Sequence, residues 1–156
     1  MQRRRFMQTA LGAAAAAALP TSTAFAQAVQ TLSKVDGAVD AIGLDGRQLT
    51  LEPAALQELR DSLQGRLLMP GHEGYDEARR VVNASIDKYP ALVVQPTGAS
   101  DVMRAVEFAR ERDLLLAVKC GGHSYGGKST CNGGLQIDLS TLRGTHVDAR
   151  TRRAHV

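Results

Sequence analysis

The chain has 156 residues, of which 44% are apolar and 22% are charged, an ordinary composition for a globular protein with a core of its own. The formal net charge is +3, and three of the positive charges are the arginines at positions 3–5. Because the remainder is close to neutral and only 4% of the residues are aromatic, the composition argues against a nucleic-acid-binding surface.

The first 26 residues have the layout of an export signal. A charged start at residues 2–5 leads to a mildly apolar region at residues 10–19 and then to the small-x-small sequence Ala24-Phe25-Ala26. The sequence Arg3-Arg4-Arg5-Phe6-Met7 resembles the twin-arginine export motif, whose pathway carries folded proteins. We therefore expect residues 1–26 to be a twin-arginine-type signal peptide that engages the export machinery, and the mature protein to be periplasmic or secreted.

An uncleaved anchor is the alternative for this segment. A spanning helix needs about 20 strongly apolar residues, and the run at residues 10–19 is shorter and rich in alanine. We expect no stable membrane span.

The mature chain begins with a segment that lacks periodicity. Residues 27–50 are small and polar, with Gly37, Gly43 and Gly46, so we expect a linker or a disordered arm there.

Two helices are expected next. Leu56, Leu59 and Leu63 recur at helical spacing after Pro53, which suits a first helical turn. The first helix should end at Gly65. Residues 69–74 have the composition of a loop, and residues 75–85 repeat the helical pattern.

A strand–helix–strand unit follows. Residues 91–94 form a short continuous apolar run, typical of a buried parallel strand. Ser100 and Asp101 suit a helix start, apolar residues then recur at helical spacing, and residues 114–118 form the next buried strand. We expect a right-handed crossover between the two strands.

Three further strands are expected. Residues 135–139 alternate apolar and polar side chains, as a half-buried strand does. Residues 145–148 and 152–156 form two strands joined by residues 149–151. Because residue 156 falls within an expected strand, we expect the domain to be incomplete.

The stretch from Cys120 to Gly127 directly follows the second buried strand. Its four glycines surround His123, and glycine in this number costs backbone entropy, which indicates a local reason for it. One interpretation is a tight, irregular turn. The other is a loop whose backbone comes close to a ligand, because open α/β sheets bind ligands at the carboxyl ends of their strands.

Two motif interpretations of this stretch lack their required context. Gly127-Lys128-Ser129 superficially suggests a phosphate loop, but the glycines at the required offsets and the following helix are missing. Gly122-His123-Ser124-Tyr125-Gly126 fits the nucleophile elbow of a serine hydrolase, but residues 126–134 cannot easily form the helix that an elbow requires. The serine hydrolase remains a lesser alternative.

Four segments in order carry a family resemblance. They are residues 89–96, the helix start at residues 100–102, Lys119-Cys120-Gly121-Gly122-His123-Ser124, and residues 129–140. Together they resemble the FAD-linked oxidases of the vanillyl-alcohol oxidase/p-cresol methylhydroxylase (PCMH) family, most closely its berberine-bridge-enzyme-like branch. The resemblance covers residues 75–156. It departs from the family at Asn132, where the family usually has Asp, and a turn tolerates either.

The resemblance implies an α+β fold with an α/β first lobe. Residues 51–156 would be the N-terminal part of a PCMH-type FAD-binding domain, comprising the βαβ lobe and the first strands of the second lobe. In this family the peptide N–H groups of the glycine-rich loop bind the FAD pyrophosphate. The implied cofactor-binding residues are Lys119, Cys120, Gly121, Gly122, His123, Ser124 and Tyr125.

His123 inherits the family's covalent attachment point to the flavin 8α-methyl group. A hydrogen-bonded loop histidine with non-covalent FAD is the alternative, since some relatives lack the bond. For Tyr125, simple packing is as good an interpretation as a contact with the cofactor. Cys120 and Cys131 are too few for a metal site, and we expect two buried or half-buried thiols.

The implied function is that of an exported flavin-dependent oxidoreductase. It would oxidise an alcohol, a sugar or a similar small molecule by hydride transfer to flavin, with dioxygen or another electron acceptor. The family's catalytic base and substrate domain would lie after residue 156, so we name no catalytic residue and expect residues 1–156 to be inactive alone. The alternative is a small exported module that holds a nucleotide-like ligand without redox chemistry.

Overall fold

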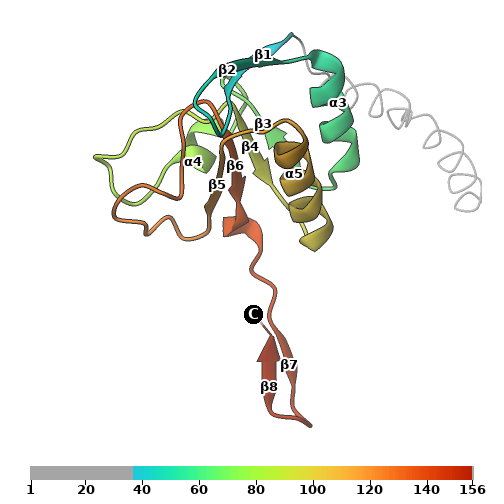
Figure 1. The fold of residues 1–156 in the computed structure, drawn as a ribbon. Coiled ribbons are helices and arrows are strands. Elements are labelled where there is room, and N and C mark those ends of the chain that lie inside the picture. Colours follow the sequence, from blue (N-terminus) through green and yellow to red (C-terminus); the bar gives the residue numbers. More distant parts are fainter. Residues whose placement is uncertain (1–36, 156) are drawn as a thin grey trace, which may run out of the picture. The chain divides into compact units, whose positions relative to one another are not determined.

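The computed structural model describes residues 37–155, so the expected signal peptide and residues 27–36 lie outside the described part. At its centre is a four-stranded sheet in the order β3-β4-β6-β5 (Figure 1). The strands are β3 (Arg66–Leu68), β4 (Leu92–Gln95), β6 (Leu135–Asp138) and β5 (Leu116–Lys119). β3 is antiparallel to β4, whereas β4, β6 and β5 run parallel. The carboxyl ends of these three strands therefore lie at one edge of the sheet.

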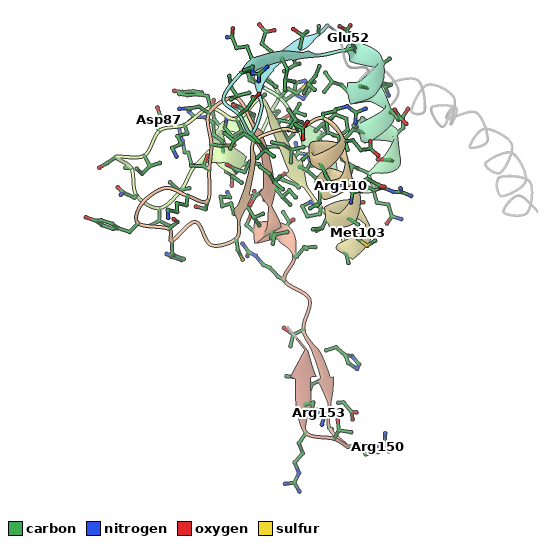
Figure 2. All side chains as sticks on the ribbon, in the orientation of Figure 1. Glu52, Asp87, Met103, Arg110, Arg150 and Arg153 are labelled. Atoms are coloured by element: carbon green, nitrogen blue, oxygen red, sulfur yellow. The ribbon has the colours of Figure 1, made fainter. Side chains whose placement is uncertain are left out.

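Helices cover both faces of this sheet (Figure 1). α3 (Pro53–Ser62) and α5 (Ala99–Glu111) pack on one face, and the short α4 (Tyr75–Arg79) packs on the other. Neighbouring strand residues serve opposite faces: Leu92 and Val94 belong to the larger core under α3 and α5, and Val93 to the smaller core under α4. Met103 and Arg110, labelled in Figure 2, lie on α5, where Met103 is exposed.

The strand at residues 135–138 is an inner strand of the sheet, which its sequence does not reveal. All four residues of β6 are buried, so the expected half-buried alternation is wrong. The physical reason is its position: β6 pairs with β4 on one side and β5 on the other, and helices cover both faces. The polar Gln136 and Asp138 are consequently held in the interior. The expected strand–helix–strand unit is present as β4–α5–β5, although its two strands are not neighbours.

A hairpin stands where the sequence predicts a linker. β1 (Val39–Ile42) and β2 (Gln48–Leu51) pair antiparallel, and Ala41 and Leu51 are buried in the larger core. The peptide N–H of Ile42 donates to the carbonyl of Gly133 over 2.8 Å. The prediction of a linker or disordered arm over residues 27–50 is therefore wrong from residue 39 onward. These strands are four residues long and depend on partners far along the chain.

The remaining boundaries differ by a few residues. α3 begins at Pro53 as predicted and ends at Ser62, and the three-residue strand β3 follows at positions for which the sequence predicts no element. α4 ends at Arg79 rather than near residue 85, because Arg80 is already extended with φ −67° and ψ 146°. A 3-10 turn, η1 (Leu139–Thr141), follows β6.

The last two strands pair with each other, as expected. β7 (His146–Asp148) and β8 (Arg153–His155) form an antiparallel two-stranded sheet of their own. Strands, mixed sheet and helices together confirm the α+β class with an α/β first lobe. Within residues 37–155, no helix has both the length and the apolar character of a membrane span.

Candidate functional site

The glycine loop, defined here as residues 120–127, leaves the carboxyl end of β5. Gly122 and Gly127 have φ values of +70° and +65°, in the left-handed region that favours glycine. A Cβ on Gly122 would lie 3.3 Å from the Cα of Val81, and one on Gly127 would lie 2.6 Å from Cγ2 of Ile86. These two glycines are thus required by backbone conformation and by packing against another segment of the protein.

That other segment, residues 80–89, is called here the support segment. It runs beside the glycine loop and the residues that follow it (Figure 1). The peptide N–H of Val82 donates to the carbonyl of Gly122 over 3.1 Å, and Nδ2 of Asn83 donates to the carbonyl of Tyr125 over 3.2 Å. Farther along, Nζ of Lys88 donates to the carbonyls of Gly127 and Thr130 over 3.0 and 3.2 Å. Hydrogen bonds from the support segment therefore hold one side of the glycine loop in place.

The support segment is itself anchored by a buried arginine. Arg79 is 6% exposed, forms ion pairs with Asp76 and Asp87, and donates to the carbonyl of Lys88 over 3.0 Å. Its guanidinium carbon lies 3.9 Å from the ring centroid of Tyr89. The hydrogen bond from Arg79 lowers the pKa of Asp87, which Figure 2 labels, so the pair stays charged at neutral pH.

Several carbonyls of the glycine loop accept hydrogen bonds from the support segment, but most of its peptide N–H groups have no such partner. Within the described chain, the peptide N–H groups of residues 121–126 donate no hydrogen bond to another residue; the next one, of Gly127, donates to the carbonyl of Ser124 over 3.1 Å. Consecutive unpaired N–H groups in a loop that is largely exposed are donors for an anion. This run is the strongest ligand-binding feature of the site.

Three of the predicted site residues surround these donors. His123 is exposed, and its ring lies over Gly121, because a Cβ on Gly121 would be 2.7 Å from Cδ2 of the imidazole. Oγ of Ser124 accepts from the peptide N–H of Lys128 over 3.1 Å and closes the turn. Tyr125 is 90% exposed, so it is not packed in a core.

Lys119 lies apart from this group. The residue is 6% exposed, and its Nζ donates to the carbonyl of Ala78 over 2.6 Å and lies 3.3 Å from Oδ1 of Asp138. Asp138 in turn accepts from Nε2 of Gln95 over 3.0 Å, so the buried ion pair has further hydrogen bonds. The prediction of a cofactor contact from this residue is corrected for its side chain, which faces the interior and joins β5 to the end of α4.

The two cysteines differ. Cys131 is buried, as expected, and burial raises the pKa of its thiol. Cys120 is exposed at the start of the glycine loop, so the expectation of a buried or half-buried thiol is wrong there. Both are free thiols. Residues 37–155 contain no group of three or more His, Cys, Asp or Glu side chains that could hold a metal ion.

The hydrolase interpretation finds no support in the geometry. A nucleophile elbow runs into a helix, whereas Ser124 begins a turn closed by the N–H groups of Gly127 and Lys128. The next element along the chain is β6.

Sequence reasoning missed the support segment altogether. Its one local signal is Asn83, whose Oδ1 accepts from the peptide N–H of Ser85 over 3.1 Å in an Asx turn. The sequence does not predict this turn, because the helical spacing of apolar residues extends to residue 85.

Comparison with known proteins agrees with this geometry. Residues 90–156 match the sequence model of a family described as "FAD binding domain". The chain is 30% identical over 95 residues to (R)-6-hydroxynicotine oxidase of Paenarthrobacter nicotinovorans, covering 61% of this chain and 21% of that protein. It is 32% identical over 97 residues to an uncharacterised FAD-linked oxidoreductase of Bacillus subtilis (strain 168), covering 62% and 22%.

Solved structures give the same picture. The crystal structure of 6-hydroxy-D-nicotine oxidase from Arthrobacter nicotinovorans superposes with a TM-score of 0.57 at 30% identity, covering 60% of this chain and 20% of that one. The berberine-bridge-enzyme-like protein 1 of Physcomitrella patens gives a TM-score of 0.54 at 26% identity, with 60% and 21% covered. The chain spans about a fifth of the length of the curated relatives it matches. The chain is thus similar to FAD-linked oxidoreductases of the vanillyl-alcohol oxidase/PCMH type, and residues 90–156 match part of an FAD-binding domain.

Proposed function

We propose that this chain supplies the pyrophosphate-binding loop of an exported flavin-dependent oxidoreductase acting on an alcohol, a sugar or a similar small molecule. The observation that carries the proposal is the run of unpaired peptide N–H groups at residues 121–126. Relatives named for 6-hydroxynicotine oxidation and for glucose dehydrogenation support a small-molecule substrate. A binding module without redox chemistry is less well supported, because the named relatives are oxidoreductases.

The residues present fit a pyrophosphate. The glycine loop contains no carboxylate that would repel it, and the peptide N–H groups of residues 121–126 donate no hydrogen bond within residues 37–155. Lys119 would not touch the phosphates, since its charge is paired with Asp138 beneath the loop. Bound FAD would supply hydride-acceptor chemistry, with dioxygen or another acceptor taking up the electrons. The residues described here bind and orient the cofactor, and we assign none of them as the catalytic base.

The surroundings of His123 support the proposal of a covalent flavin link. Its ring is exposed, rests on Gly121, and has no hydrogen-bond partner among residues 37–155 that would occupy its nitrogens. We propose that one of them bonds the 8α-methyl carbon of the flavin.

The test is acid precipitation of the flavin-loaded protein. We expect the wild-type precipitate to stay yellow, and His123→Ala to release its flavin into the supernatant. His72→Ala is the matched control, because it removes another exposed loop histidine and should keep the colour. If wild-type flavin also washes out, the covalent role is wrong, while non-covalent FAD binding is unaffected.

We also propose that residues 1–26 direct export by the twin-arginine pathway, which places the protein in the periplasm or outside the cell. The charged start, the alanine-rich region and the Ala24-Phe25-Ala26 sequence support this. A reporter fused to residues 1–26 should be exported from a bacterial cytoplasm. Changing Arg3 and Arg4 to Lys should block this export and leave the reporter in the cytoplasm. Export that is insensitive to this change would contradict the proposed pathway.

A further inference from the structure

Asn83 uses both ends of its side-chain amide. Oδ1 accepts from the peptide N–H of Ser85 over 3.1 Å, which fixes the side chain within its own segment. Nδ2 donates to the carbonyl of Tyr125 over 3.2 Å, in the glycine loop. Because the first bond occupies the oxygen, the amide presents a donor to Tyr125, and a carbonyl is the partner that a donor requires.

These contacts set the direction of two peptide groups in the loop. In a trans peptide the carbonyl and the following N–H point in opposite directions, and the described chain has no cis peptide bond. The Tyr125 carbonyl faces Asn83, so the N–H of Gly126 points away from the support segment. The Gly122 carbonyl faces the N–H of Val82, so the N–H of His123 points away from it as well. Both are among the unpaired donors of the loop.

Packing does not restrain the Tyr125–Gly126 peptide in the way it restrains Gly122. A Cβ on Gly126 would have no atom within 4 Å, and the Tyr125 side chain is 90% exposed. A glycine in open space leaves this peptide free to rotate unless a hydrogen bond holds it. Within residues 37–155, the bond from Asn83 is the one side-chain hydrogen bond to that peptide.

We infer that Asn83 is a positioning residue that holds the N–H of Gly126 toward the cofactor pyrophosphate. The inference rests on the proposed function, because it takes FAD as the ligand of the glycine loop. The peptide N–H of Val82 holds the Gly122 carbonyl in the same way. That bond comes from the backbone, so only the Asn83 bond can be removed by a side-chain substitution. Asn83 itself touches no cofactor.

The experiment is a titration of the purified protein with FAD, followed by flavin fluorescence, together with thermal unfolding in the absence of FAD. Asn83→Ala should weaken FAD binding about tenfold, the effect of one hydrogen bond on an equilibrium. The unfolding midpoint should not change, because Asn83 is half-buried and outside both cores. Ser85→Ala is the matched control: it keeps the peptide N–H that Asn83 accepts from, and FAD affinity should equal that of the wild type.

Asn83→Asp tests the hydrogen bond to Tyr125 separately from the Asx turn. It keeps the acceptor for Ser85 and so preserves the Asx turn, but it sets a carboxylate oxygen against the Tyr125 carbonyl. Positioning predicts FAD binding at least as weak as in Asn83→Ala.

Wild-type affinity in Asn83→Asp, or a lowered unfolding midpoint with unchanged FAD affinity in Asn83→Ala, would overturn the inference alone. Failure of the wild-type protein to bind FAD would overturn the proposed function, and this inference with it.

Discussion

The four glycines of the glycine loop have different roles. Gly122 and Gly127 combine positive φ with close packing against the support segment, so the protein itself requires them. Gly121 makes room for the His123 ring, and Gly126 faces open space. The sequence predicts the loop and its central histidine correctly, but it cannot show which glycines serve the fold. That depends on residues 81–86, about forty positions earlier.

A pair of glycine substitutions tests the placement of His123. A Cβ at residue 121 would lie 2.7 Å from Cδ2 and 3.0 Å from Nε2 of the imidazole, so Gly121→Ala must displace the ring. The ring is the movable end of a flexible side chain, so we expect stability to change by less than about 0.5 kcal/mol. The fraction of flavin that remains after acid precipitation should fall several-fold.

Gly144→Ala, outside the glycine loop, is the matched control. Its Cβ would meet no atom within 4 Å, and its backbone is not in the left-handed region, so flavin retention should stay at the wild-type level. Equal retention in the two variants would contradict the packing of His123 on Gly121.

At the scale of elements, helical spacing and continuous apolar runs predicted α3, α5, β4 and β5 to within a few residues. The features that the sequence did not predict belong to short strands whose partners lie far along the chain. The β1–β2 hairpin depends on a bond from Ile42 to Gly133, and β6 owes its burial to insertion between β4 and β5. A local pattern carries no information about such pairings.

For Asp101, the local sequence signal reveals only part of the structural role of the residue. The sequence marks it as an acid in the first turn of a helix. In the structure its carboxylate also accepts from the peptide N–H groups of Gln64, Gly65 and Thr97 over 2.9, 3.0 and 2.8 Å, joining α5 to the end of α3. Burial alone would raise the pKa of Asp101, but these hydrogen bonds outweigh it and lower the pKa.

We therefore expect Asp101→Asn to lower the free energy of unfolding by about 2–4 kcal/mol at pH 7, measured by urea denaturation. A carboxyl whose pKa is lowered on folding stabilises above its unfolded pKa, near 3.9, and loses this effect as the pH falls further. The difference between wild type and Asp101→Asn should therefore shrink below about pH 4.

The control is Asp61→Asn, which changes an exposed carboxyl on α3 and should cost less than about 0.5 kcal/mol. Equal effects at positions 61 and 101 would show that the hydrogen bonds to Asp101 do not hold the two elements together.

For the whole molecule, the ordered match over two strands, a helix and a loop predicted the α+β class and the FAD-binding family. The sheet order β3-β4-β6-β5 and the support segment behind the loop could not be predicted, because both arise from contacts between distant parts of the chain.

The central claim is that the glycine loop binds the pyrophosphate of FAD. Its most direct test compares the affinity of the purified protein for FAD and for riboflavin, which has the same ring system without phosphates. We predict that FAD binds at least about tenfold more tightly, since several charge-assisted hydrogen bonds are lost with riboflavin, and that ADP competes with FAD. Equal affinities for FAD and riboflavin, with no competition by ADP, would contradict the claim.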